Sequence, residues 1–115
     1  MDSKLIRNDL IYPDLSYKII GCAFEVFNAL GPGHSEKIYQ KALAESFKEK
    51  IIARGYLDFQ VEERIIVELK KDERFSKIHI EQVLQYLKNS SLQLAIIINF
   101  TKTGVISKRV INIAA

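Results

Sequence analysis

The stretch GYLDFQVEERIIVELKK, residues 55–71, decides how the chain folds. Polar and apolar residues alternate from Gly55 to Val61, which predicts a strand with one apolar face. The segment from Ile65 to Lys70 is almost entirely apolar apart from Glu68 and Lys70, so it predicts a second strand. The polar residues between the two segments predict a turn. The stretch is therefore expected to form a β-hairpin.

The acidic and basic residues of this hairpin need a common face to act together. Glu68 and Lys70 are two positions apart, so in a strand they share a face. Charged groups on a buried strand are costly unless other charges offset them, and Asp58 is the obvious third member. With a three-residue turn at residues 62–64, Asp58 lies opposite Glu68. With a two-residue turn, Asp58 would share a face with Val67 instead.

Two interpretations of this D-x9-E-x-K spacing stay open at this point. Two carboxylates beside a lysine suit a hard divalent cation such as Mg²⁺, which prefers oxygen ligands and a substrate phosphate. Alternatively, the residues form a cross-strand ion pair on a surface hairpin, which contributes less than about 1 kcal/mol.

The composition bounds the class of protein. A chain of 115 residues is expected to form a single domain, residues 14–115, after an N-terminal arm, residues 1–13. Its formal charge of +3 tolerates a polyanionic partner without predicting one. Cys22 is the only cysteine, which excludes an intrachain disulfide. The first residues show no signal-peptide pattern and no apolar run is long enough to span a membrane, so we expect a cytoplasmic protein without membrane contact.

Hydrophobic spacing predicts the remaining elements. A first helix, capped by Asp14 or Ser16, ends at Gly31–Pro32, and Ser35 caps a second helix that reaches Lys50. The expected buried stripe of the first helix is Ile19, Ile20, Ala23, Phe24, Phe27 and Leu30.

The carboxyl-terminal half is expected to contain one helix and two strands. Ser76 caps a helix over residues 77–88, closed by Asn89. A strand buried on both faces covers residues 92–100, and a last strand covers residues 105–113. The resulting order, α-α-β-β-α-β-β, is an α/β fold with a small mixed sheet flanked by helices.

Four motifs in order resemble the GxxExxY family, a branch of the PD-(D/E)xK nuclease-like superfamily. GHSEKIY, residues 33–39, fits GxxExxY, and LDFQVEERIIVELK, residues 57–70, resembles the metal-binding hairpin with Asp58, Glu68 and Lys70 in place. His79, Gln82 and Tyr86 are similar to the family's third helix, and residues 94–112 look like its closing strands. The resemblance runs from about Asp9 to Ile113 and implies a restriction-endonuclease-like core.

The resemblance implies a Mg²⁺-dependent nuclease that hydrolyses phosphodiester bonds, of DNA in preference to RNA, with Mn²⁺ able to replace Mg²⁺. Asp58 and Glu68 would hold the metal with the Leu69 carbonyl, and Glu36 would reach it directly or through water. Lys70 would assist the attacking water. Gln82 would orient a ligand or water. The candidate substrate contacts are Tyr86, His79, Tyr39, Lys108 and Arg109.

The chain departs from the family before Asp58. Family members carry a hairpin between the second helix and the Asp-bearing strand, whereas here Lys50 and Gly55 are almost adjacent, so this first hairpin is expected to be shortened or missing. A bare sheet edge would result. The alternative is therefore an inactive nuclease-fold module that binds nucleic acid or a protein partner through that edge, and a homodimer could form there. A small metal-binding structural protein ranks third.

Overall fold

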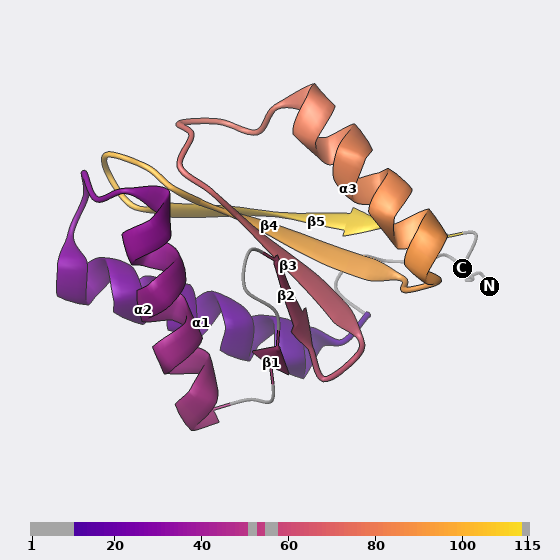
Figure 1. Cartoon of the computed structure of the whole chain (residues 1–115), viewed down its shortest axis with the longest axis horizontal. Helices are drawn as coiled ribbons and strands as arrows, with labels where there is room; N and C mark the ends of the chain where they lie inside the picture. Colours follow the sequence, from indigo (N-terminus) through magenta and orange to yellow (C-terminus); the bar gives the residue numbers. More distant parts are fainter. Residues whose placement is uncertain (1–10, 51–52, 55–57, 114–115) are drawn as a thin grey trace.

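The computed structural model describes residues 11–50, 53–54 and 58–113, without the side chains at positions 49–50, 53–54 and 58. Most of the predicted arm, residues 1–10, lies outside the described residues. The described chain forms three helices and five strands (Figure 1), which in chain order are α1 (Pro13–Leu30), α2 (Glu36–Lys50), β1 (Ala53–Arg54), β2 (Asp58–Val61), β3 (Ile65–Lys70), α3 (Lys77–Ser90), β4 (Leu94–Phe100) and β5 (Val105–Ile111).

The strands form one mixed sheet in the order β1-β2-β3-β4-β5. Only β3 and β4 are parallel, because α3 connects them as a crossover; the other neighbours are antiparallel. Helices α1 and α2 cover one face and α3 covers the other (Figure 1). The α/β fold with a small mixed sheet is confirmed. One element was not expected: β1, where a plain connection was predicted, pairs Ala53 with Val61 and Arg54 with Gln60.

The turn between β2 and β3 fixes which residues of the hairpin face each other. Val61 pairs with Ile65, so three residues form the loop, and Asp58 pairs with Glu68. Glu62 and Glu63 have φ angles of 51° and 58°, and the Arg64 backbone N–H donates to the Val61 carbonyl at 3.0 Å. Positive φ at both central residues is the type I′ geometry that matches the twist of paired strands. Of the two turns that the sequence left open, the structure has the three-residue one, which is the turn that a site combining Asp58 with Glu68 requires.

Strand β4 separates two hydrophobic cores. All seven of its residues are buried, as predicted for a strand covered on both faces. Val67 and Leu69 of β3 belong to the core under α1 and α2, whereas Ile66 belongs to the core under α3. Because side chains alternate along a strand, Glu68 and Lys70 follow Ile66 on the α3 face.

The helix ends follow the sequence in two cases. Ser35 and Ser76 cap α2 and α3: the Ile38 N–H donates to the Ser35 hydroxyl at 3.3 Å, and the His79 N–H donates to the Ser76 hydroxyl at 3.5 Å. The predicted end of α3 at Asn89 is wrong, because the helix continues to Ser90. None of the described helices is both long and apolar enough to cross a lipid bilayer.

Helix α1 departs from its prediction at the cap and along its face. Neither Asp14 nor Ser16 caps it; Tyr12 holds the cap position in the left-handed region without a side-chain hydrogen bond, and Pro13 opens the helix. Phe24, expected in the core, is exposed. The buried positions are Leu15, Ser16, Ile19, Cys22, Ala23 and Val26.

Tyr39 of α2 is a core residue. Its ring stacks on Phe100 with centroids 4.2 Å apart, and 1% of its surface is exposed. Its hydroxyl donates to the Gly31 carbonyl at 2.7 Å, and the His34 N–H approaches the same oxygen at 3.4 Å. This burial leaves no surface for the substrate contact expected of Tyr39, so we do not carry it into the site below.

Replacing Glu62 with glycine should stabilise the protein. Glycine relieves a left-handed conformation that costs an L-residue about 1–2 kcal/mol and loses part of the gain to the entropy of the unfolded chain. We expect a net increase of about 0.5–1 kcal/mol in the free energy of unfolding, measured in guanidinium chloride. Lys102→Gly, at an exposed turn position without positive φ, should destabilise. If Glu62→Gly and Lys102→Gly destabilise the protein equally, the backbone of Glu62 is not strained.

Tyr39→Phe should lower the free energy of unfolding by about 1 kcal/mol, because the Gly31 carbonyl loses its donor. The matched control is Tyr86→Phe, at a residue that is 48% exposed, and it should change stability by less than about 0.5 kcal/mol. Equal midpoints for both variants in a denaturant titration would show that the Tyr39 hydroxyl does not secure the α1–α2 connection.

Candidate active site

Glu68 and Lys70 form an ion pair at the end of β3. The Lys70 ammonium lies 3.1 Å from Glu68 Oε1, and the two side chains are 24% and 19% exposed. This partial burial sets the pair apart from a fully solvated one, since less water screens its charges. Because Glu68 and Lys70 are two positions apart in β3, a carboxylate and an ammonium group lie side by side on one face of the sheet.

Asp58 enters the site through its backbone. It pairs directly with Glu68, and residues that pair directly in antiparallel strands share a face. The side chain of Asp58 lies outside the description. Among the described side chains, no three His, Cys, Asp or Glu residues gather closely enough to hold a metal ion. On this face Glu68 is the described carboxylate that Asp58 pairs with through its backbone.

Two rows of residues cross the α3 face at this end of the sheet. In one row Glu68 pairs with Ile97 of β4, which pairs with Lys108 of β5. In the next row Lys70 pairs with Asn99. Lys108 is exposed, so it can meet a ligand that lies across the strands. Asn99 was missed by sequence reasoning, although a lone amide in the apolar run LAIIINF is a visible signal.

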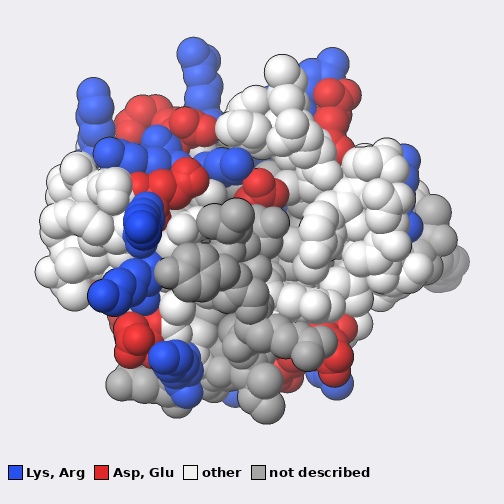
Figure 2. All heavy atoms as spheres, in the orientation of Figure 1, with Lys and Arg blue, Asp and Glu red and all other residues white. Residues whose placement is uncertain are grey.

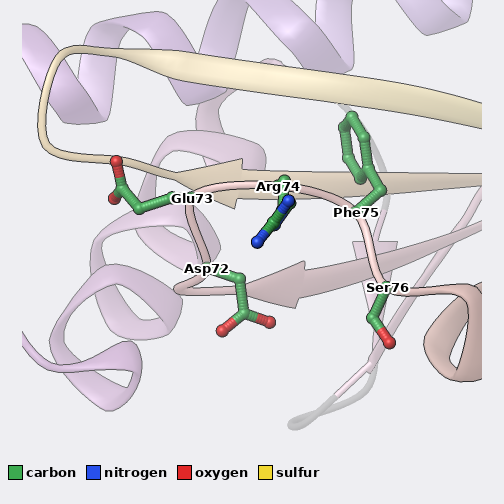
Figure 3. Close-up of a pocket in the computed structure, with 5 residues that line it drawn as sticks. All are labelled: Asp72, Glu73, Arg74, Phe75 and Ser76. Carbon is green, nitrogen blue, oxygen red and sulfur yellow. The ribbon is translucent and has the colours of Figure 1, made fainter.

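The loop after β3 borders the site and is tied down at three points. The Asn99 amide nitrogen donates to the carbonyls of Asp72 and Arg74 at 3.2 and 3.1 Å. The Glu73 carboxylate accepts from the Lys102 N–H at 3.0 Å. An open pocket of about 410 Å³ is lined by residues 72–76. In Figure 3 the carboxylates of Asp72 and Glu73 point away from each other.

The predicted stripe of α3 is only partly connected to this end of the sheet. His79 Nδ1 lies 3.6 Å from the Asp72 carboxylate. Gln82 and Tyr86 are exposed, because Val83 and Leu87 beside them face the core. Within the described part of the chain, no hydrogen bond joins Gln82 to Glu68 or Lys70. The expected approach of Gln82 to the Glu68–Lys70 pair stays a prediction.

Two further candidates lie elsewhere. Glu36 is the first residue of α2, which covers the face of the sheet opposite α3 (Figure 1), and among the described residues no hydrogen bond or ion pair joins it to Glu68. Arg109 donates to the Ser16 hydroxyl at 2.7 Å and to the Ile11 carbonyl at 2.6 Å. These bonds hold its guanidinium against α1, so we do not carry Arg109 into the site.

Comparison with known proteins identifies the family. A family model described as the PD-(D/E)XK nuclease superfamily matches residues 13–54 and 46–112. No curated protein and no solved structure matches the chain. The matched residues span both helical layers and include Asp58, Glu68 and Lys70. The chain therefore belongs to the PD-(D/E)XK nuclease superfamily.

Proposed function

We propose that this protein is a metal-dependent nuclease of the GxxExxY type that hydrolyses phosphodiester bonds, of DNA in preference to RNA. One observation carries the proposal: Glu68 of the partly buried Glu68–Lys70 pair is the β3 residue that pairs with the backbone of Asp58. Membership of a nuclease superfamily supports the same chemistry. A surface ion pair without function would not require a second carboxylate at the paired position.

The donor set fits a hard divalent cation. Asp58 and Glu68 would hold it with the backbone carbonyl of Leu69, and Glu36 would approach from the start of α2. Carboxylate and carbonyl oxygens are the ligands that Mg²⁺ prefers, and Mn²⁺ accepts the same set. When bound, the metal would supply Lewis-acid stabilisation of the phosphate under attack.

The side chains around that position divide the remaining work. The Lys70 ammonium steadies negative charge on the phosphate and orients the attacking water, and Glu68 keeps the ammonium in place. Gln82 orients the water or a ligand, and His79 and Tyr86 border the substrate from α3.

Lys108, two strands away on the same face, contacts a backbone phosphate and adds affinity without sequence preference. Basic and acidic side chains are interspersed on the surface seen in Figure 2. On the face shown there, binding would rely on a few separate cations rather than on a continuous basic surface.

A second function is a binding module without catalysis, which would use an exposed edge of the sheet. Among the described residues β1 is an edge strand of the sheet, and an edge strand presents unpaired backbone groups to a partner. Such a module would bind a polynucleotide with an affinity that falls as salt rises, and would cleave nothing. A second copy of the chain pairing at this edge would give a homodimer.

Purified protein should cleave plasmid or single-stranded DNA in Mg²⁺ or Mn²⁺ and not in EDTA. Lys70→Met should lower kcat by about 10²–10³-fold, because it removes one charged donor from the transition state. Gel and fluorescence assays measure both effects. Lys18→Met, at an exposed position of α1, is the matched control and should cleave like wild type. Intact DNA and RNA after incubation with wild type in Mn²⁺ would contradict the nuclease.

Metal binding can be tested apart from cleavage. Titration calorimetry with Mn²⁺ should show one site, and Glu68→Gln should weaken it at least about tenfold, since a neutral amide replaces a carboxylate ligand. Glu81→Gln, at an exposed position of α3, should leave the affinity unchanged. Equal Mn²⁺ affinity of wild type and Glu68→Gln would remove Glu68 from the metal site.

A further inference from the structure

Asn99 is the polar residue of a strand that is otherwise apolar on both faces. It is 1% exposed and pairs with Lys70 across the parallel β3–β4 ladder. Ala95 and Ile97, which alternate with it along β4, pack in the core under α3. Asn99 therefore lies on the α3 face, directly beside Lys70.

The hydrogen bonds of the Asn99 amide fix its orientation. Both hydrogens of its nitrogen are used, one toward the Asp72 carbonyl and one toward the Arg74 carbonyl. A flipped amide would set its oxygen against two carbonyl oxygens, so the assignment is determined by the network. The Oδ1 atom consequently points away from the loop. It is buried and meets no donor among the described residues.

Lys70 has the donors that this oxygen lacks. Its ammonium carries three hydrogens, and the contact recorded for it is the one with Glu68. Its four-carbon stem is flexible, so a single partner holds the charge loosely. A buried carbonyl without a donor costs stability, which favours any nearby hydrogen-bond donor that can reach it.

We propose that Asn99 is a positioning residue for Lys70. A change of rotamer along the flexible Lys70 stem would bring the ammonium to Asn99 Oδ1, which meets no donor in the described structure, while Asn99 Nδ2 holds the loop that borders the site. Together with Glu68, this fixes the ammonium at two points before a phosphate arrives. The catalytic consequence rests on the proposed nuclease function, whereas the contact itself does not.

A double-mutant cycle on stability tests the contact without any cleavage. Asn99→Ala and Lys70→Met are made singly and together, and the unfolding equilibrium constant is measured in denaturant. If Asn99 bonds to Lys70, the effects should couple by about threefold to tenfold. The matched control is Glu73→Ala, which frees the same loop at Lys102 without touching Lys70, and should couple with Lys70→Met by less than about twofold.

Asn99→Asp separates the two tasks of the amide and guards against a poorly folded alanine variant. It keeps an oxygen toward Lys70 and loses both donors to the loop. Amide hydrogen exchange at residues 72–76 should therefore become faster, while coupling to Lys70→Met persists. If Asn99→Ala couples with Lys70→Met no more than Glu73→Ala does, Asn99 is only a loop anchor and the inference is overturned.

Kinetics test the catalytic part. Asn99→Ala should lower kcat about tenfold with KM changed less than about twofold, and Asn99→Asp should recover part of kcat. Glu73→Ala should lower kcat far less. A protein that shows the stability coupling but cleaves no substrate would overturn the nuclease proposal and the catalytic part of this inference, while the contact would stand. Equal kcat losses in Asn99→Ala and Glu73→Ala would overturn positioning through Lys70.

Discussion

The register between β2 and β3 is the constraint on which the candidate site depends. A slip of one residue would turn every side chain of β2 to the other face of the sheet. Asp58 would then leave the face of Glu68, and Phe59 and Val61 would leave the core under α1 and α2. Burial of those two apolar side chains therefore fixes the register that pairs Asp58 with Glu68. The strained pair of left-handed residues in the turn is tolerated because the strands on both sides demand this register.

The α3 face of the sheet has an apolar part under the helix and a polar part at the end of β3. Beneath α3 the face is closed by Ile66, Ala95, Ile97 and Val110 with the helix above them. Beyond Ile66, β3 continues with charged residues on the same face, and the strand therefore carries its ion pair from the edge of a dry core toward solvent. The proposed binding of a cation and a substrate phosphate would need this combination of rigid support and access. The loop after β3, tied at three points, forms one wall of that end.

The sequence predicted the features that depend on neighbours a few residues apart. Ser35 and Ser76 were recognised because an N-cap bonds within its own first turn, and the hairpin was recognised because a polar turn separates two nearby apolar segments, although its loop length stayed open. It failed where distant packing decides. The buried face of α1 is set by α2 and the sheet, so Phe24 lies outside it, and Tyr12 adopts a backbone conformation that no local pattern indicates. The Glu68–Lys70 pair was predictable because its two residues are neighbours in the sequence. The role of Asn99 was not predictable, because it depends on the pairing of β4 with β3.

The contact of Arg109 with α1 has a consequence for how the protein is made. The Ser16 hydroxyl and the Ile11 carbonyl that it binds lie 93 and 98 residues earlier in the chain. The amino end of the first helix is thus secured by a side chain that leaves the ribosome only with the last strand. These contacts join residues that lie far apart in the sequence, so they form only after β5 has docked on the sheet, and their closure is a non-local step of folding.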